Sequence, residues 1–316
     1  MTFDTHILFM IINFLRRYFP NRLKKLIFSK QDLDILIKYK QNSCYPPGHY
    51  YSPIVDVESI KAKGKEIWPE IPHVPAEIDL NANQQIDLLH KLKKYYNDFP
   101  YRKDAKDGLR YTLINTFFDP LDAITLYSFI RHLRPKKIIE VGSGFSSAVM
   151  LDTNDNFNNK SIRLTFIEPF PERLNNLFRS GDQEVSTIIE KDLQEVPLEI
   201  FASLKENDIL FIDSTHVCKT GSDLNYLFFQ ILPVLNKGVI IHFHDVFNSF
   251  EYPREWVLGG RNWNENYLLR AFLMYNDAFK ILLFNEYLFH NYYKELIGAF
   301  PFPDLTTGGS IYLLKN

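Results

Sequence analysis

The sequence has few cysteines, no long apolar run and no excess of charge of one sign. Cys44 and Cys218 are its only cysteines among 316 residues, which excludes a disulfide scaffold and a four-cysteine zinc site and is typical of a reducing cytoplasm. The 36 Lys and Arg residues nearly balance the 38 Asp and Glu residues. This balance argues against a nucleic-acid-binding protein, which needs a basic face to neutralise phosphates.

An apolar stretch near the amino terminus runs from Ile7 to Leu15 and is followed by Arg16 and Arg17. It has less than half of the roughly 20 apolar residues that a membrane-spanning helix needs. It also lacks the preceding positive charge and the small-residue cleavage site of a secretory signal. We therefore predict a surface helix that packs on its own domain or on a second copy of the chain. The alternative is an interfacial helix at the inner face of an anionic membrane.

Two proline-rich stretches divide the first part of the chain. The first stretch covers residues 45–53 and the second covers residues 68–75, and each contains three prolines. Prolines at this density exclude regular structure. Between 84 and 96, apolar residues recur at helical spacing. We predict an extension of helices and loops over residues 1–110 and a main domain over 111–316. The aromatic segment Cys44 to Pro53 is predicted to fold over the functional site as a lid.

The main domain alternates between strand and helix patterns. Its hydrophobic residues, 46% of the whole chain, can bury a large core,. This alternation predicts an α/β fold with a doubly wound, mainly parallel sheet and helices on both faces, with an antiparallel return at the edge. The predicted strands are 137–141, 162–167, 184–189, 208–212, 239–243, 279–284 and 310–314, and the predicted helices are 121–133, 146–151, 171–179, 222–235 and 263–275.

Acidic or imidazole side chains follow five of these strands. In such sheets, ligands bind at the carboxyl ends of the strands. Taken singly, each residue outside the Glu140-to-Gly144 segment is explained by a turn, a helix cap or a hydrogen-bonded histidine at the edge of the core. All five strand ends together favour a binding site. The residues are Glu140 with Gly142 and Gly144, then Glu168, Asp192, Asp213 with His216, and His244 with Asp245.

Several of these segments resemble the ordered motifs of class I S-adenosylmethionine-dependent methyltransferases. They are Glu140-Val-Gly-Ser-Gly144, Phe166-Ile-Glu-Pro169, Lys191-Asp192 and Ile212-Asp213. Four further sequence segments resemble those of a bacterial group of the methyltransferase-24 type. They are Pro47 to Pro53, Val141 to Ser147, Asp213 to His216 and His244 to Phe247. The resemblance runs from about Cys44 to the carboxyl end. It implies a Rossmann-like seven-stranded sheet whose last two strands form an antiparallel edge hairpin.

The resemblance also implies a role for each cofactor-binding residue. Glu140 would hold the methionine part of S-adenosylmethionine, directly or through water, and Gly142 and Gly144 would let the backbone approach it. Glu168 would bind the ribose hydroxyls. At the adenine, Asp192 would contact the amino group, with Leu193 stacking nearby.

The residues after the fourth and fifth strands are candidates for catalysis. An oxygen acceptor must lose a proton, to a general base or with the help of a metal. We predict His216 as the base, beside Asp213. The placement of Asp213, His244 and Asp245 also resembles the ligands of metal-dependent catechol-type methyltransferases, except that His244 replaces a carboxylate. An imidazole suits Mn²⁺, Fe²⁺ or Zn²⁺ better than Mg²⁺.

The sequence thus predicts a cytoplasmic enzyme that methylates an oxygen of a small-molecule or carbohydrate-type acceptor. The side chains predicted to flank the opening of its site are Tyr50, Tyr51, Trp256, Arg261 and Trp263. One alternative is a Rossmann-type NAD-dependent oxidoreductase, although Ser147 stands where its motif requires a third glycine,. The other is a methyltransferase-like scaffold or binding module that keeps the fold without the activity.

Overall fold

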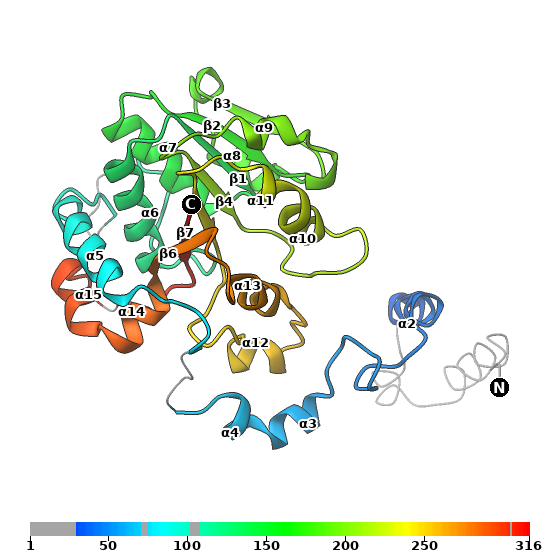
Figure 1. The fold of residues 1–316 in the computed structure, drawn as a ribbon. Coiled ribbons are helices and arrows are strands. Elements are labelled where there is room, and N and C mark those ends of the chain that lie inside the picture. The colour runs from blue at the N-terminus through cyan, green and yellow to red at the C-terminus, as the bar shows by residue number, and fades with distance from the viewer. Residues whose placement is uncertain (1–29, 71–74, 102–107, 304) are drawn as a thin grey trace, which may run out of the picture. The chain divides into compact units, whose positions relative to one another are not determined.

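The computed structural model describes residues 30–70, 75–101, 108–303 and 305–316 (Figure 1). The chain forms two compact units, Met1–Ile60 and Lys61–Asn316. The predicted helix around Ile7–Leu15 lies outside the described residues. Within the described ranges, no helix combines the length and the apolar character needed to cross a membrane.

The second unit is built on a seven-stranded, mainly parallel sheet. Its strands are β1 (Lys137–Val141), β2 (Arg163–Ile167), β3 (Ser186–Ile189), β4 (Ile209–Ile212), β5 (Ile240–Phe243), β6 (Phe279–Phe284) and β7 (Ile311–Lys315). They lie in the order β3-β2-β1-β4-β5-β7-β6, and only β7 runs antiparallel to its two neighbours. The order reverses between β1 and β4, which is where such sheets form ligand sites.

Helices cover both faces of this sheet (Figure 1). One face carries α5 (Ala82–Tyr96), α6 (Pro120–Leu133) and α7 (Phe145–Phe157), and the other carries α9 (Leu198–Ala202), α10 (Asp223–Tyr226), the π-helical turn η4 (Leu227–Ile231), α11 (Leu232–Val234) and α13 (Glu265–Leu273). Each face has its own apolar cluster. The predicted doubly wound architecture is therefore confirmed.

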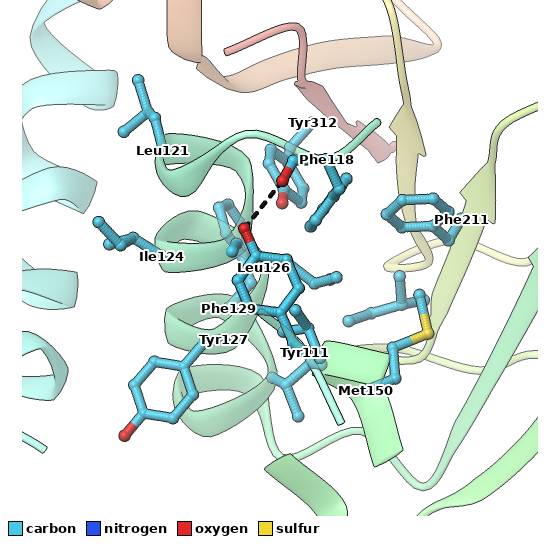
Figure 2. Close-up of a cluster of buried hydrophobic side chains, with 14 of the residues drawn as sticks. Tyr111, Phe118, Leu121, Ile124, Leu126, Tyr127, Phe129, Met150, Phe211 and Tyr312 are labelled. Carbon is cyan, nitrogen blue, oxygen red and sulfur yellow. Dashed lines mark hydrogen bonds between the residues drawn. The ribbon is translucent and has the colours of Figure 1, made fainter. Parts of the chain in front are cut away.

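Helix α6 is the centre of one of these clusters. Proline at its first position and the left-handed Arg134 after its last turn mark its two ends,. Its inward side chains pack with Phe118, Phe211 and Tyr312 (Figure 2). The Tyr111 hydroxyl donates to the Phe118 carbonyl at 2.8 Å. Burying these large side chains, at about 25 cal/mol per Å² of apolar surface, holds the segment before α6 against the sheet.

Short elements complete the second unit. They are α4 (Gly64–Ile67), α8 (Glu172–Leu177), the 3-10 turns η2 (Asp182–Glu184) and η3 (Leu193–Glu195), α12 (Arg254–Leu258), α14 (Asn285–Asn291) and α15 (Tyr293–Ala299), while α3 (Val57–Ala62) bridges the boundary between the units. Helix α5, which the sequence analysis placed in the extension, belongs here. Its Gln85 side chain receives a hydrogen bond from the backbone of Phe284 in β6, at 2.8 Å.

The edge of the sheet differs from the sequence prediction in one respect. The two last strands pair antiparallel as expected, with β6 at the edge and β7 between β5 and β6. They do not form a simple hairpin, because α14 and α15 lie between them, in a segment whose sequence showed no clear helical pattern. Aromatic residues dominate this segment, and their modest helix propensity hid the apolar positions Leu288 and Leu296 that anchor it,.

The first unit contains α2 (Lys30–Asn42) and the proline-rich stretch that follows. Residues 45–53 form neither helix nor strand, as predicted. Gly48 adopts a φ of +79° and donates its N–H to the Ile54 carbonyl, and the rings of Tyr45 and His49 stack at 4.6 Å. The lid function of this segment stays a prediction.

Candidate functional site

The tight turn after β1 brings the ends of β1 and β4 together. Gly142 has a φ of +75°, and a Cβ atom there would lie 1.9 Å from the Asp213 carbonyl oxygen. Asp213 in turn donates its N–H to the Val141 carbonyl at 2.8 Å. Only glycine fits this position. At Gly144, by contrast, the backbone is extended and a Cβ would make ordinary contact with Arg173.

The buried side chain of Glu140 stabilises this turn through hydrogen bonds with two serines. Its side chain is fully buried and lines neither of the two cavities at this end of the sheet. The Ser146 hydroxyl donates to it at 2.5 Å, and the Ser147 hydroxyl, which accepts from the Gly144 N–H, also donates to it. Burial raises the pKa of Glu140 to about 8,. Glu140 therefore influences the larger of these cavities only through the Ser146 side chain, which lines that cavity.

One cavity, of about 390 Å³, lies at the ends of β1, β2 and β3. It gathers Gly142, Glu168, Asp192 and Leu193, four of the predicted cofactor-binding residues. The two carboxylate oxygens of Glu168 accept the backbone N–H groups of Ser143 and Phe170, at 3.1 and 3.0 Å. These bonds fix the orientation of Glu168 and leave further lone pairs free for ligand hydroxyls. Asp192 is exposed and Leu193 is buried.

A second cavity, of about 730 Å³, adjoins the first. The two cavities share Asp213, Ser214 and Thr215 after β4. Its size is in the range of small-molecule sites. Carboxylates, imidazoles and aromatic rings line it, among them Asp119, Asp122, Asp213, His216, His244, Asp245, Phe117, Phe145, Trp256 and Trp263.

His216 lies among three carboxylates at the base of this cavity. Its Nδ1 atom is 2.7 Å from Glu265 Oε2. Its Nε2 atom is 3.3 Å from Asp213 Oδ1 and 3.6 Å from Asp245 Oδ2. Burial alone would lower the pKa of His216, but its bonds with Asp213 and Glu265 outweigh burial and hold it well above 6.5,. The two carboxylates therefore favour the protonated form of the imidazole.

The backbone around His216 is unusual. His216 and Asp245 both adopt left-handed conformations, with φ of +59° and +56°, which are sparsely populated for residues other than glycine. The carbonyl of His216 accepts the N–H groups of Asn264 and Glu265, at 3.0 and 3.2 Å. The amino end of α13 thus anchors the loop that carries His216. Such conformations cluster at functional sites because the surrounding structure must enforce them.

Three ligand atoms, one each from Asp213, His216 and Asp245, lie within 4.8 Å of one another. The set predicted from the sequence contained His244 in place of His216. In the structure His244 Nε2 is 3.2 Å from the Phe117 carbonyl, and its Nδ1 is buried without a partner. Carboxylates beside it, Asp245 foremost, outweigh burial and raise its pKa to about 9. His244 therefore contacts the wall of the cavity at Phe117, and His216 is the imidazole that lies near both Asp213 and Asp245.

Glu265 is a site residue that the sequence analysis missed. It is buried, starts α13 and contacts His216 from 49 positions away in the sequence. A carboxylate on the far nitrogen of a histidine fixes the tautomer and orientation of the ring. The acidic residue at the start of the helix was the only sequence signal, and helix capping explains it equally well.

Comparisons with known proteins agree with this geometry. Residues 139–246 match the family described as "Methyltransferase domain". An uncharacterized protein of Archaeoglobus fulgidus is 34% identical over 171 residues, which are 52% of this chain and 76% of that protein.

Among solved structures, the chain is similar in fold to the Podospora anserina methyltransferase PaMTH1 with bound SAH. The identity is 15%, the coverage is 87% of this chain and 99% of that one, and the TM-score is 0.42. It is also similar to a putative caffeoyl-CoA O-methyltransferase from Staphylococcus aureus, at 17% identity, 75% and 100% coverage and a TM-score of 0.39.

The family match begins in β1 and ends just after β5. It thus spans the strand ends that form both cavities, including the glycine turn and the acids after β2, β3 and β4. The chain accordingly belongs to the class I S-adenosylmethionine-dependent methyltransferases, as an enzyme of the methyltransferase-24 type.

Proposed function

We propose that this enzyme methylates an oxygen atom of a small-molecule or carbohydrate-type acceptor, which binds in the 730 Å³ cavity. The observation that carries this proposal is the group of Asp213, His216 and Asp245 at the base of that cavity, next to the cofactor-side cavity. An acidic group paired with an imidazole suits a hydroxyl acceptor, because such a nucleophile must lose a proton.

The residues of the smaller cavity fit the cofactor. S-adenosylmethionine supplies an activated methyl group on a positively charged sulfur. Glu168 is oriented by two backbone N–H groups beside a turn that only glycine permits, which leaves room for a ribose at close range. The acids Glu168, Asp192 and Asp213 around this cavity suit a cation better than a pyrophosphate. Ser147, bonded to Gly144 and Glu140, replaces the third glycine of a dinucleotide site, so hydride transfer is not favoured,.

Replacement of Glu168 by alanine tests the cofactor assignment. We expect S-adenosylhomocysteine to bind at least about tenfold more weakly, since two hydrogen bonds from the ribose to a carboxylate are lost, each contributing about 1 kcal/mol or more. Isothermal titration calorimetry measures the change. Glu172→Ala, an exposed acid on the nearby helix α8, is the matched control. Unchanged affinity in a folded Glu168→Ala protein would refute the ribose assignment.

The chemistry at Asp213 and His216 follows from their charges. Asp213 has a pKa below its usual value, because His216 and His244 outweigh the effect of burial. Its side chain is 36% exposed, on the wall that both cavities share. We propose that Asp213 accepts the hydrogen bond of the acceptor hydroxyl. His216 favours its protonated form and must release the proton before it can act as a base.

The same residues could hold a divalent metal ion. Two carboxylates and an imidazole form a ligand set suited to Mn²⁺, Fe²⁺ or Zn²⁺,. Glu265 would orient His216 for this role,. A bound ion would lower the pKa of the acceptor hydroxyl.

Chelation separates the two mechanisms. With metal, we expect activity to vanish in excess EDTA after metal stripping and to return on addition of Mn²⁺ or Mg²⁺. This result would make His216 a ligand. Full activity of the stripped enzyme in EDTA would instead assign deprotonation to the Asp213–His216 pair. The assay follows methyl transfer from labelled S-adenosylmethionine to an acceptor.

A further inference from the structure

Two arginines at the larger cavity lie over aromatic rings. The guanidinium carbon of Arg261 is 4.1 Å from the centre of the Trp256 ring and 5.1 Å from that of Trp263. The guanidinium carbon of Arg173 is 4.4 Å from the centre of the Phe117 ring. All five side chains line this cavity. Cation–π contacts of this kind hold a guanidinium in place without using its N–H groups, which stay available for a ligand.

Neither arginine has a carboxylate within 4 Å among the described residues. Four other described arginines are paired in this way, Arg110, Arg131, Arg254 and Arg270, whereas Arg134, Arg163 and Arg179 are not. Arg173 and Arg261 have no such partner, and both are exposed. Two unpaired positive charges therefore face a cavity whose base is lined by carboxylates, and a ligand there meets a strongly polarised field.

The positions of the two arginines differ relative to the reacting centre. A Cβ atom at Gly144 would lie 3.4 Å from Arg173 Nη1, so Arg173 lies beside the turn predicted to face the methionine part of the cofactor. The Trp263 ring contacts the guanidinium of Arg261 and also packs on the His216 ring, with the two ring centres 4.3 Å apart. Arg261 is therefore connected to the acceptor side through a single aromatic ring.

We propose that the methyl acceptor carries an anionic group, a carboxylate or a phosphate, which binds Arg261 at the rim of the cavity. Its hydroxyl then points to Asp213. The interior acids Asp119, Asp122 and Asp245 repel an anion, so only one orientation of such an acceptor places its negative charge favourably,. This inference rests on the proposed function and narrows its acceptor to hydroxylated acids or phosphorylated hydroxy compounds.

Matched probes test the inference in the full-length enzyme saturated with S-adenosylhomocysteine. Catechol is compared with 3,4-dihydroxybenzoate, and glucose with glucuronate and glucose 6-phosphate, by titration calorimetry. Catechol and 3,4-dihydroxybenzoate share the two adjacent hydroxyls and differ in the carboxylate. The three sugars share the hydroxyls at carbons 1 to 4 and differ at carbon 6, which carries a hydroxyl, a carboxylate or a phosphate. We expect at least one anionic probe to bind about tenfold or more tightly than its neutral partner, and the stronger arm identifies carboxylate or phosphate.

Arg261→Gln should reduce this preference to about twofold or less while the affinity for S-adenosylhomocysteine stays unchanged. Arg254→Gln is the matched control, because Arg254 is exposed on α12 and already paired with Glu255. Equal binding of neutral and anionic probes, binding of none, or a preference that survives in Arg261→Gln would overturn the inference. Failure of the unmodified enzyme to bind S-adenosylhomocysteine would instead refute the proposed function.

Discussion

Replacement of Asp213 by asparagine is expected to reduce kcat/KM for methyl transfer by roughly 1,000-fold or more. Among the described residues, Asp213 is the carboxylate that lines both cavities, and it also contacts His216. An amide keeps its shape but removes the negative charge that accepts the acceptor's hydrogen bond or holds a cation. The substitution is therefore severe with or without a metal. Methyl transfer from labelled S-adenosylmethionine measures the loss.

The matched control for this substitution is Asp87→Asn. Asp87 is exposed on α5, away from both cavities, and we expect full activity from this variant. A circular dichroism spectrum and a thermal melt establish that each variant is folded. If folded Asp213→Asn retains activity within tenfold of the unmodified enzyme, the reacting centre does not lie at the end of β4.

Gly142→Ala is expected to destabilise the protein by ~3 kcal/mol or more and to abolish S-adenosylhomocysteine binding. A Cβ at 1.9 Å from the Asp213 carbonyl cannot be accommodated without parting the ends of β1 and β4. The left-handed conformation adds a further cost of about 1 kcal/mol for alanine. The clash is with a backbone carbonyl oxygen, so a change of side-chain rotamer cannot relieve it. Urea denaturation and titration calorimetry provide the two measurements.

A second glycine supplies the control for this prediction. Gly298 lies within α15, and a Cβ there would meet no atom within 4 Å. Gly298→Ala should leave cofactor binding intact and raise the free energy of unfolding by up to about 1 kcal/mol, because alanine favours the helix. Equal stability of the Gly142→Ala and unmodified proteins would contradict the role of the β1 turn.

The sequence predicted the strands well because their signals are local. Short β-branched runs bounded by turn residues, such as 137–141 before Gly142, need no knowledge of distant neighbours,. The sheet order then placed Glu168 and Asp213 at one end, since parallel strands share their carboxyl edge,. The predicted bounds of β1 and β6 were exact, and those of the other five strands agreed within two residues.

The details of the site depend on geometry that local patterns do not encode. The sequence analysis named His244 as the candidate imidazole ligand, whereas in the structure it is a His216 nitrogen that lies near Asp213 and Asp245, within a loop whose backbone is left-handed at His216. Glu265 reaches the site across the segment that contains β5 and α12. Such long-range pairing leaves no periodic trace in the sequence, so only the folded chain reveals it.

The insertion of β7 between β5 and β6 has a consequence for synthesis on the ribosome. Until β7 has been made, β5 and β6 each keep an unpaired edge on the side where β7 will lie,. Both strands carry mostly buried, apolar side chains. The nascent chain therefore passes through a state in which the edges of two apolar strands are unpaired at the same time. Such a state is prone to self-association. Strand β7 follows Gly308 and Gly309, which line the larger cavity. The pairing of β7 with β5 and β6 and the completion of the cavity wall therefore occur in the same late folding step.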